Sequence, residues 1–167
     1  VGVLTTAAKA EMASEESMAL AYKMMTTLNK YARDVMVKYN VHACTDVTGF
    51  GMLGHTYEMA QGSDVEITLN VDAIDMIPEA LELARIGILP AGMYRNRKFA
   101  EAGVDAGDTE LAKQDLLYDP QTAGGLLMAV APEDADALFE ELKTTVPSAQ
   151  RIGTVAEYQG GKRIKLR

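Results

Sequence analysis

A chain of 167 residues is long enough to bury a hydrophobic core as one domain without disulfides or a structural metal. With 48% hydrophobic and 24% charged residues, its composition is that of an ordinary soluble globular protein. The net charge of -8 argues against a surface for nucleic acid or anionic membranes, which need clustered lysines and arginines. Cys44 is the only cysteine, so no intrachain disulfide can form and we expect a reducing, cytoplasmic location. No apolar run approaches the ~20 residues of a membrane span.

The first 40 residues predict a strand followed by a long helix. Residues 1–6 have the composition of a strand, and because the sequence begins inside this element we expect it to be part of a longer chain. Ser14, followed by Glu15 and Glu16, indicates a helix start, since a hydroxyl cap and acidic residues favour the first turn. One amphipathic helix is then predicted to end near Asn40, from apolar residues at steps of three or four. They are Met18, Tyr22, Met25, Leu28, Ala32, Val35 and Tyr39. We interpret the methionines of this stretch as core residues, with a cofactor or partner groove as the alternative.

The remainder of the chain alternates short strands and helices. Strands are predicted at 41–47, 65–69, 126–131, 152–158 and 163–166, the last two as a hairpin around residues 159–162. Helices are predicted at 52–60, 78–84, 111–117 and 132–144, with an irregular loop at 93–108 and another at 119–125. Because the order has no regular strand–helix–strand rhythm, the sequence predicts an α+β fold, with helices packed on a mixed or antiparallel sheet.

The first segment suited to chemistry runs from Thr45 to Gly51, between a predicted strand and a helix. Its glycines, Gly49 and Gly51, permit tight turns and the close approach of a ligand, and the following helix start offers free amides to an anion. Asp46, at the strand end, could hold Mg²⁺, which takes oxygen ligands and usually bridges to phosphate. The alternative is a plain helix-start turn, in which Asp46 or Thr48 only caps the helix.

The second segment is the loop from Asp119 to Gly125, just before a strongly apolar strand. Gly124 and Gly125, beside Gln121 and Thr122, could form an anion-binding nest of backbone amides. The alternative is an ordinary turn that leads into the strand, because Asp, Pro and Gly dominate turns. Neither segment is a Walker loop or a dinucleotide-binding fingerprint.

Both histidines and the cysteine are candidate metal ligands. His42, Cys44 and Asp46 alternate, so on a strand they would share one face and could form a transition-metal site. Neighbours on one face of a strand lie roughly 6 to 7 Å apart, however, which is too wide for one ion without a bend. We therefore interpret Cys44 as a small buried residue and His55 as a hydrogen-bonded structural residue.

At these two segments the sequence resembles the selenophosphate synthetase (selenide, water dikinase) family. Residues 43–55, ACTDVTGFGMLGH, differ from the family run ACTDVTGFGLLGH only at Met52. Residues 119–127, DPQTAGGLL, resemble the family run DPQTSGGLL, with Ala123 in place of the serine. Weaker matches follow the family order at residues 2–9, 25–29 and 94–96, so the resemblance covers nearly the whole chain.

The resemblance implies a fold, a reaction and a set of site residues. It implies membership of the aminoimidazole ribonucleotide synthetase superfamily, with residues 1–167 as a single C-terminal α+β domain that lacks the N-terminal nucleotide-binding domain. The implied reaction converts ATP, selenide and water into selenophosphate, AMP and phosphate with Mg²⁺. Asp46 would contribute to the Mg²⁺ site. Thr45, Thr48, Gly49 and Gly51 would shape its loop, and the facing wall of the cleft would be lined by Gln121, Thr122, Gly124 and Gly125.

The family's catalytic cysteine or selenocysteine, its essential lysine and most of its metal-binding aspartates belong to the other domain. The resemblance therefore assigns no catalytic residue here and implies that this chain alone is inactive. It also suggests that the full-length protein is a homodimer. Two alternatives stay open: a non-catalytic dimerisation or selenium-delivery module, and the C-terminal domain of another ATP-dependent member of the superfamily.

Overall fold

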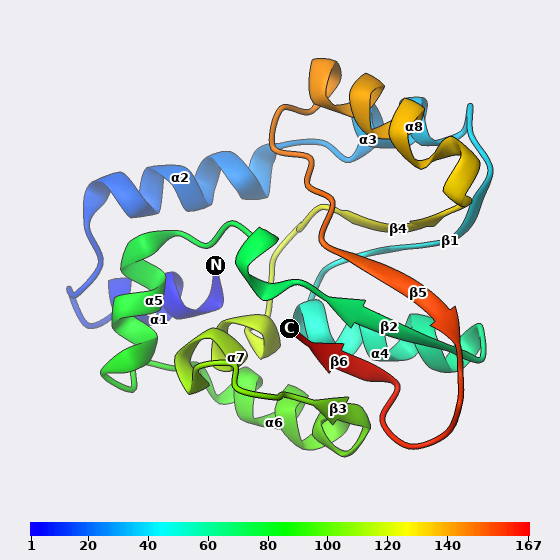
Figure 1. Ribbon diagram of the computed structural model, residues 1–167. Coiled ribbons are helices and arrows are strands. Elements are labelled where there is room, and N and C mark those ends of the chain that lie inside the picture. Colours follow the sequence, from blue (N-terminus) through cyan, green and yellow to red (C-terminus); the bar gives the residue numbers. More distant parts are fainter.

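The computed structural model describes all 167 residues and has two separate sheets with helices packed around them (Figure 1). In the smaller sheet, β1 (Val41–Asp46) and β4 (Leu126–Val130) pair antiparallel. The larger sheet has the order β3-β6-β2-β5. Its strands are β2 (Val65–Leu69), β3 (Val104–Asp105), β5 (Gly153–Glu157) and β6 (Ile164–Leu166). Since β2 is antiparallel to β5 and parallel to β6, the sheet is mixed, and the predicted α+β class is confirmed.

The predicted hairpin at the C-terminal end is wrong. β5 and β6 do form as strands, and Gly160 and Gly161 between them have positive φ values of 93° and 84°. β2 nevertheless lies between the two strands and pairs with both, so β5 and β6 have no direct ladder. The glycine turn is therefore a wide connection that passes the end of β2 rather than a tight hairpin loop.

Eight α-helices surround the sheets. They are α1 (Gly2–Ala8), α2 (Glu15–Thr26), α3 (Lys30–Met36), α4 (Gly51–Gly62), α5 (Pro78–Arg85), α6 (Ala91–Ala100), α7 (Leu111–Tyr118) and α8 (Pro132–Thr145). Ser14 caps α2 as predicted, since its hydroxyl accepts from the Ser17 amide at 3.2 Å. None of these helices has the length and apolar character that crossing a membrane requires.

The first residues form a helix, α1, so the predicted opening strand is wrong. Val3, Leu4 and Ala7 are buried, which is the spacing of one helical face. They pack against Ala21 of α2 and Leu83 of α5. These distant contacts decide the conformation, because the local composition of residues 1–6 favours a strand.

The predicted single helix up to Asn40 is divided in two. α2 ends at Thr26, Thr27 is extended with ψ of 121°, and α3 begins at Lys30. The hydroxyl of Thr27 bonds back to the Lys23 carbonyl at 2.7 Å, which closes the end of α2. Met18 and Met25 pack against the core around α1, as interpreted, whereas Met24 is exposed.

Residues 91–100 form a regular helix, α6, where the sequence predicts an irregular loop with short helical pieces. Pro90 precedes the first turn in an extended conformation. Met93, Asn96 and Ala100 are buried at helical spacing, while Arg95 and Lys98 between them are exposed. Because one of the three buried positions is an asparagine and the residues around it are polar, hydrophobic periodicity does not indicate this helix.

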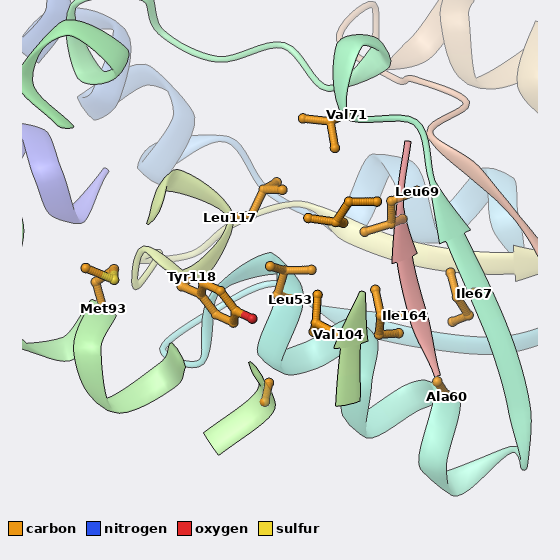
Figure 2. Packing of buried hydrophobic residues seen from close by; sticks show 12 residues of the cluster. Leu53, Ala60, Ile67, Leu69, Val71, Met93, Val104, Leu117, Tyr118 and Ile164 are labelled. Carbon is orange, nitrogen blue, oxygen red and sulfur yellow. The ribbon is translucent and has the colours of Figure 1, made fainter. Parts of the chain in front are cut away.

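The main core lies between α4, the four-stranded sheet, α6 and α7 (Figure 2). Leu53 of α4, Tyr118 of α7 and Ile164 of β6 are among its most completely buried side chains. A smaller cluster joins Val35 of α3 to Leu138 and Leu142 of α8, and these two helices lie side by side over β1 and β4 (Figure 1). The core thus fixes α4 on one side of β1 and α3 on the other, close to where β1 ends.

Candidate functional site

The two family-like segments lie against each other at one end of the smaller sheet. Asp46, the last residue of β1, is opposite Leu126, the first residue of β4. Beyond that pair, the Val47 amide donates to the Gly125 carbonyl at 2.9 Å, and the Gln121 amide donates to the Thr48 carbonyl at 3.0 Å. The two loops therefore form one continuous wall, whereas the resemblance implied two walls facing each other.

Two of the glycines are required by this contact between the loops. A Cβ on Gly124 would lie 2.1 Å from the Val47 carbonyl oxygen. Gly51 has φ of +71°, and a Cβ there would lie 2.8 Å from the Tyr118 carbonyl. By contrast, Gly49 and Gly125 have open space where a side chain would be. Of the four predicted glycines, only these last two leave room for a ligand to approach the backbone.

Asn96 of α6 joins the two loops from behind. Its side chain is almost completely buried, and its Nδ2 donates to the Gly49 carbonyl at 2.8 Å and to the Tyr118 carbonyl at 2.9 Å. One amide group thus satisfies a carbonyl inside the first family-like segment and a carbonyl directly before the second. The sequence contained a signal for this residue in the weak match at residues 94–96, but periodicity did not identify it.

His55 has the structural, hydrogen-bonded role that the sequence predicts. The side chain is buried in α4, with Nε2 3.2 Å from the Thr48 hydroxyl and Nδ1 3.1 Å from the Glu58 carboxylate. Phe50 packs its ring 5.6 Å from the imidazole and stacks on Phe99 at 5.4 Å. These contacts hold the first loop on α4 and α6, and they orient the Thr48 side chain toward the protein.

Asp119 anchors the second loop to the start of α1. It is 1% exposed, and burial raises the pKa of its carboxyl group, while hydrogen bonds from the backbone amides of Val3 and Gly2 oppose that rise. The side chain of Gln121 also turns inward and donates to the Asp119 carboxylate at 2.9 Å. Thr122, in contrast, is exposed to solvent. Ligand contacts by Gln121 and Thr122 stay predictions.

Asp46 lines an open cleft of about 620 Å³ between α3 and the end of β1. Thr45 and Cys44 line the same cleft, as do Lys30 and Arg33 of α3. The carboxylate of Asp46 makes no hydrogen bond or ion pair with the protein, in contrast to the buried Asp119. It is therefore available to a ligand.

The residues of this chain fit one part of a Mg²⁺ coordination shell. Mg²⁺ is commonly held by one or two protein carboxylates, with water and phosphate oxygens completing its octahedron. An exposed, unpaired carboxylate at the cleft edge meets that requirement, and Asp46 provides one. No group of three or more His, Cys, Asp or Glu side chains is arranged to hold a metal, and His42, Cys44 and Asp46 lie along the exposed face of β1.

Cys44 is exposed, so its interpretation as a buried residue is wrong. The alternation of β1 places it on the solvent side together with His42 and Asp46. Partial burial of the thiol raises its pKa, and the negative charge of Asp46 raises it further. The thiol is thus held in its protonated, weakly nucleophilic form.

Lys30 and Arg33 are the cleft residues that the sequence did not single out. Exposed cations on an amphipathic helix are common, and the predicted helix up to Asn40 placed them far from any motif. Their position in the cleft follows from the break between α2 and α3.

Comparisons with known proteins agree with the resemblance. A family model described as AIR synthase related protein, C-terminal domain, matches residues 2–165. A selenide, water dikinase of Treponema denticola is 48% identical over 141 residues, which are 84% of this chain and 40% of that protein. Those of Caldanaerobacter subterraneus and Clostridium botulinum (Eklund 17B) are 44% and 39% identical, covering 95% and 100% of this chain but 46% and 48% of theirs. The chain spans less than half the length of these relatives, and it belongs to the AIR synthase related protein, C-terminal domain family.

Proposed function

We propose that this chain is the C-terminal domain of a cytoplasmic selenide, water dikinase, which makes selenophosphate, AMP and phosphate from ATP, selenide and water. The observation that carries the proposal is the unpaired carboxylate of Asp46, at the edge of an open cleft and beside two joined loops that match the family runs. The relatives that share 39–48% identity with the chain bear this enzyme name, which supports the choice within the superfamily.

In this proposal the chain holds one side of a Mg²⁺–polyphosphate complex. Bound Mg²⁺ neutralises charge on phosphate oxygens and orients the phosphoryl group for transfer. Asp46 supplies a carboxylate oxygen to it, and the open backbone at Gly49 and Gly125 leaves space for phosphate against the wall. Val47 and Gly124 hold that wall in one conformation through the contact between the loops. An N-terminal nucleotide-binding domain completes the site in this proposal, and two copies of the full-length protein form a dimer.

The metal role is tested in the full-length enzyme with Asp46→Asn, which keeps the size of the side chain and removes its charge. We expect selenide-dependent ATP turnover to fall by about 100-fold or more, since a charge-stabilising contact at the reacting phosphates is lost. Asp108→Asn, at an exposed aspartate without an ion pair, is the matched control and should leave turnover unchanged. Near-normal turnover in Asp46→Asn would remove the proposed metal role.

The proposal also assigns no complete active site to the chain alone. Incubation of the isolated chain with ATP, selenide and Mg²⁺ should yield no selenophosphate by phosphorus NMR, whereas the full-length protein should yield it. Selenophosphate formed by the chain alone would show that the remaining catalytic groups lie within residues 1–167.

A further inference from the structure

The cleft carries positive charge opposite Asp46. Lys30 and Arg33 lie three residues apart on α3, so they project from the same side of the helix. Their side chains are 66% and 62% exposed, and both line the cleft that Asp46 lines. A protein with a net charge of -8 thus places two cations in a cleft that Thr45, Asp46 and Leu126 of the family-like runs also line.

One carboxylate, that of Asp34, holds both cations. Arg33 contacts it at 2.9 Å, and the Lys30 ammonium pairs with its second oxygen. The hydrogen bond from Lys30 is the largest influence that lowers the pKa of Asp34 below its usual range. Two positive charges and one negative charge leave this trio with a net charge of +1. Asp34 therefore orders the two side chains but does not neutralise them.

The backbone that carries these cations is fixed to the wall of loops. Asn29, just before α3, donates its side-chain amide to the Gly124 carbonyl at 2.9 Å. On its other face, α3 buries Val35 against Leu138 and Leu142 of α8. Because both ends of this arrangement are attached, α3 cannot move its cations away from the cleft without breaking a core contact or this hydrogen bond.

A carboxylate and a cation pair across one cleft match the chemistry of a metal–polyphosphate ligand. The carboxylate suits the metal, and charged nitrogens suit the phosphate oxygens, with Arg able to donate two parallel hydrogen bonds. We propose that Lys30 and Arg33 bind the polyphosphate of a Mg²⁺-complexed nucleoside triphosphate, and that Asp34 positions them while it competes with the phosphate. The identity of the nucleotide rests on the proposed function above, whereas the polyphosphate site does not.

The test uses the full-length protein with two probes, Mg²⁺–tripolyphosphate and the non-hydrolysable ATP analogue with a methylene bridge between its β and γ phosphates. Calorimetry should show that Lys30→Ala/Arg33→Ala raises the Kd for both probes about tenfold, as expected for the loss of charge-assisted contacts. Binding of adenosine should not change, since adenosine carries no phosphate. Asp34→Asn should lower both Kd values by about two- to fivefold, because the cations lose their competitor.

Lys38→Ala is the matched control, because Lys38 is exposed and pairs with Glu141 away from the cleft. An unchanged tripolyphosphate Kd in the double variant overturns the inference, as does an equal loss for adenosine, which would indicate a structural effect. Weaker binding in Asp34→Asn would also contradict it. If tripolyphosphate binding depends on Lys30 and Arg33 but the ATP analogue does not bind, the cation pair stands and the proposed nucleotide function fails.

Discussion

The side chain of Asn96 should contribute more to stability than any other polar group at the joined loops. It is 5% exposed and donates to the Gly49 carbonyl of the first loop at 2.8 Å and to the Tyr118 carbonyl, directly before the second loop, at 2.9 Å. Asn96→Ala removes two hydrogen bonds and leaves at least one buried carbonyl without a donor. At about 1–3 kcal/mol for the buried Tyr118 carbonyl left unsatisfied and about 0.5–1.5 kcal/mol for the lost bond to Gly49, the expected loss is about 1.5–4.5 kcal/mol. For a chain of this size that lowers Tm by roughly 3–18 °C.

Asn96→Asp extends the same test to the direction of the hydrogen bonds. A carboxylate has no donor at neutral pH and faces two carbonyl oxygens, so this variant should be less stable than Asn96→Ala at pH 8. Lys98→Ala, on an exposed face of the same helix, is the control and should stay within about 0.5 kcal/mol of the parent protein. Urea unfolding followed by circular dichroism measures all three. A loss below about 0.5 kcal/mol in Asn96→Ala would refute the reasoning, because two buried bonds cannot contribute so little unless water replaces the amide.

Three further outcomes follow from the site. Gly124→Ala should lower the free energy of unfolding in urea by about 2–4 kcal/mol, because its methyl group would meet the Val47 carbonyl. Gly125→Ala is the control and should have a smaller effect, because a side chain there has open space. Equal effects of the two substitutions would contradict the contact between the loops. Burial raises the pKa of Tyr118 to about 12. The folded state then keeps a proton that the unfolded chain loses near its ordinary pKa of about 10, so stability falls between about pH 10 and 12, by up to about 3 kcal/mol. Tyr118→Phe should remove that part of the alkaline decline, and an unchanged profile would argue against burial of the phenol. Asp46→Asn should speed alkylation of Cys44 by iodoacetamide at pH 8 about twofold, because loss of the negative charge lowers the thiol pKa. A slower reaction would show that the charge of Asp46 does not raise the pKa of Cys44.

Elements with strong local signals were predicted from the sequence. β2 shows the strict alternation of a half-exposed strand, α2 has a serine cap with acidic residues behind it, and α8 begins with a proline at its first position. In each case the backbone conformation and the burial pattern depend on residues within one or two turns. Sequence periodicity is sufficient for such segments because tertiary contacts reinforce the local preference.

Segments whose conformation depends on distant contacts were not predicted. α1 is helical because its buried face meets α2 and α5, although its own residues favour a strand. The connection between β5 and β6 contains two glycines with positive φ, which is a strong hairpin signal, yet β2 occupies the position between them. No local pattern reveals that a strand from elsewhere in the chain separates two consecutive ones.

At the site, the two family-like runs located the loops in the sequence, but the role of each residue in them became clear only from the structure. The glycines suggested close approach of a ligand, and for Gly124 the close approach is that of the other loop. Lys30 and Arg33 had no signal at all, because exposed cations on a helix are the usual case and their partner Asp34 is equally ordinary. Only the break that turns α3 toward the loops makes them part of the cleft.

The contact between the loops also limits what the chain can offer to a ligand. The backbone of Val47 and Thr48 bonds to the second loop, and the side chain of Gln121 turns inward to Asp119. Asp46 remains the one unpaired carboxylate at the cleft, and one carboxylate leaves most of a Mg²⁺ octahedron to water, substrate oxygens or other protein groups. We propose that such a wall, with one unpaired carboxylate, belongs to a domain that closes a site built mainly elsewhere, and relatives more than twice as long as this chain have the length for such a second part.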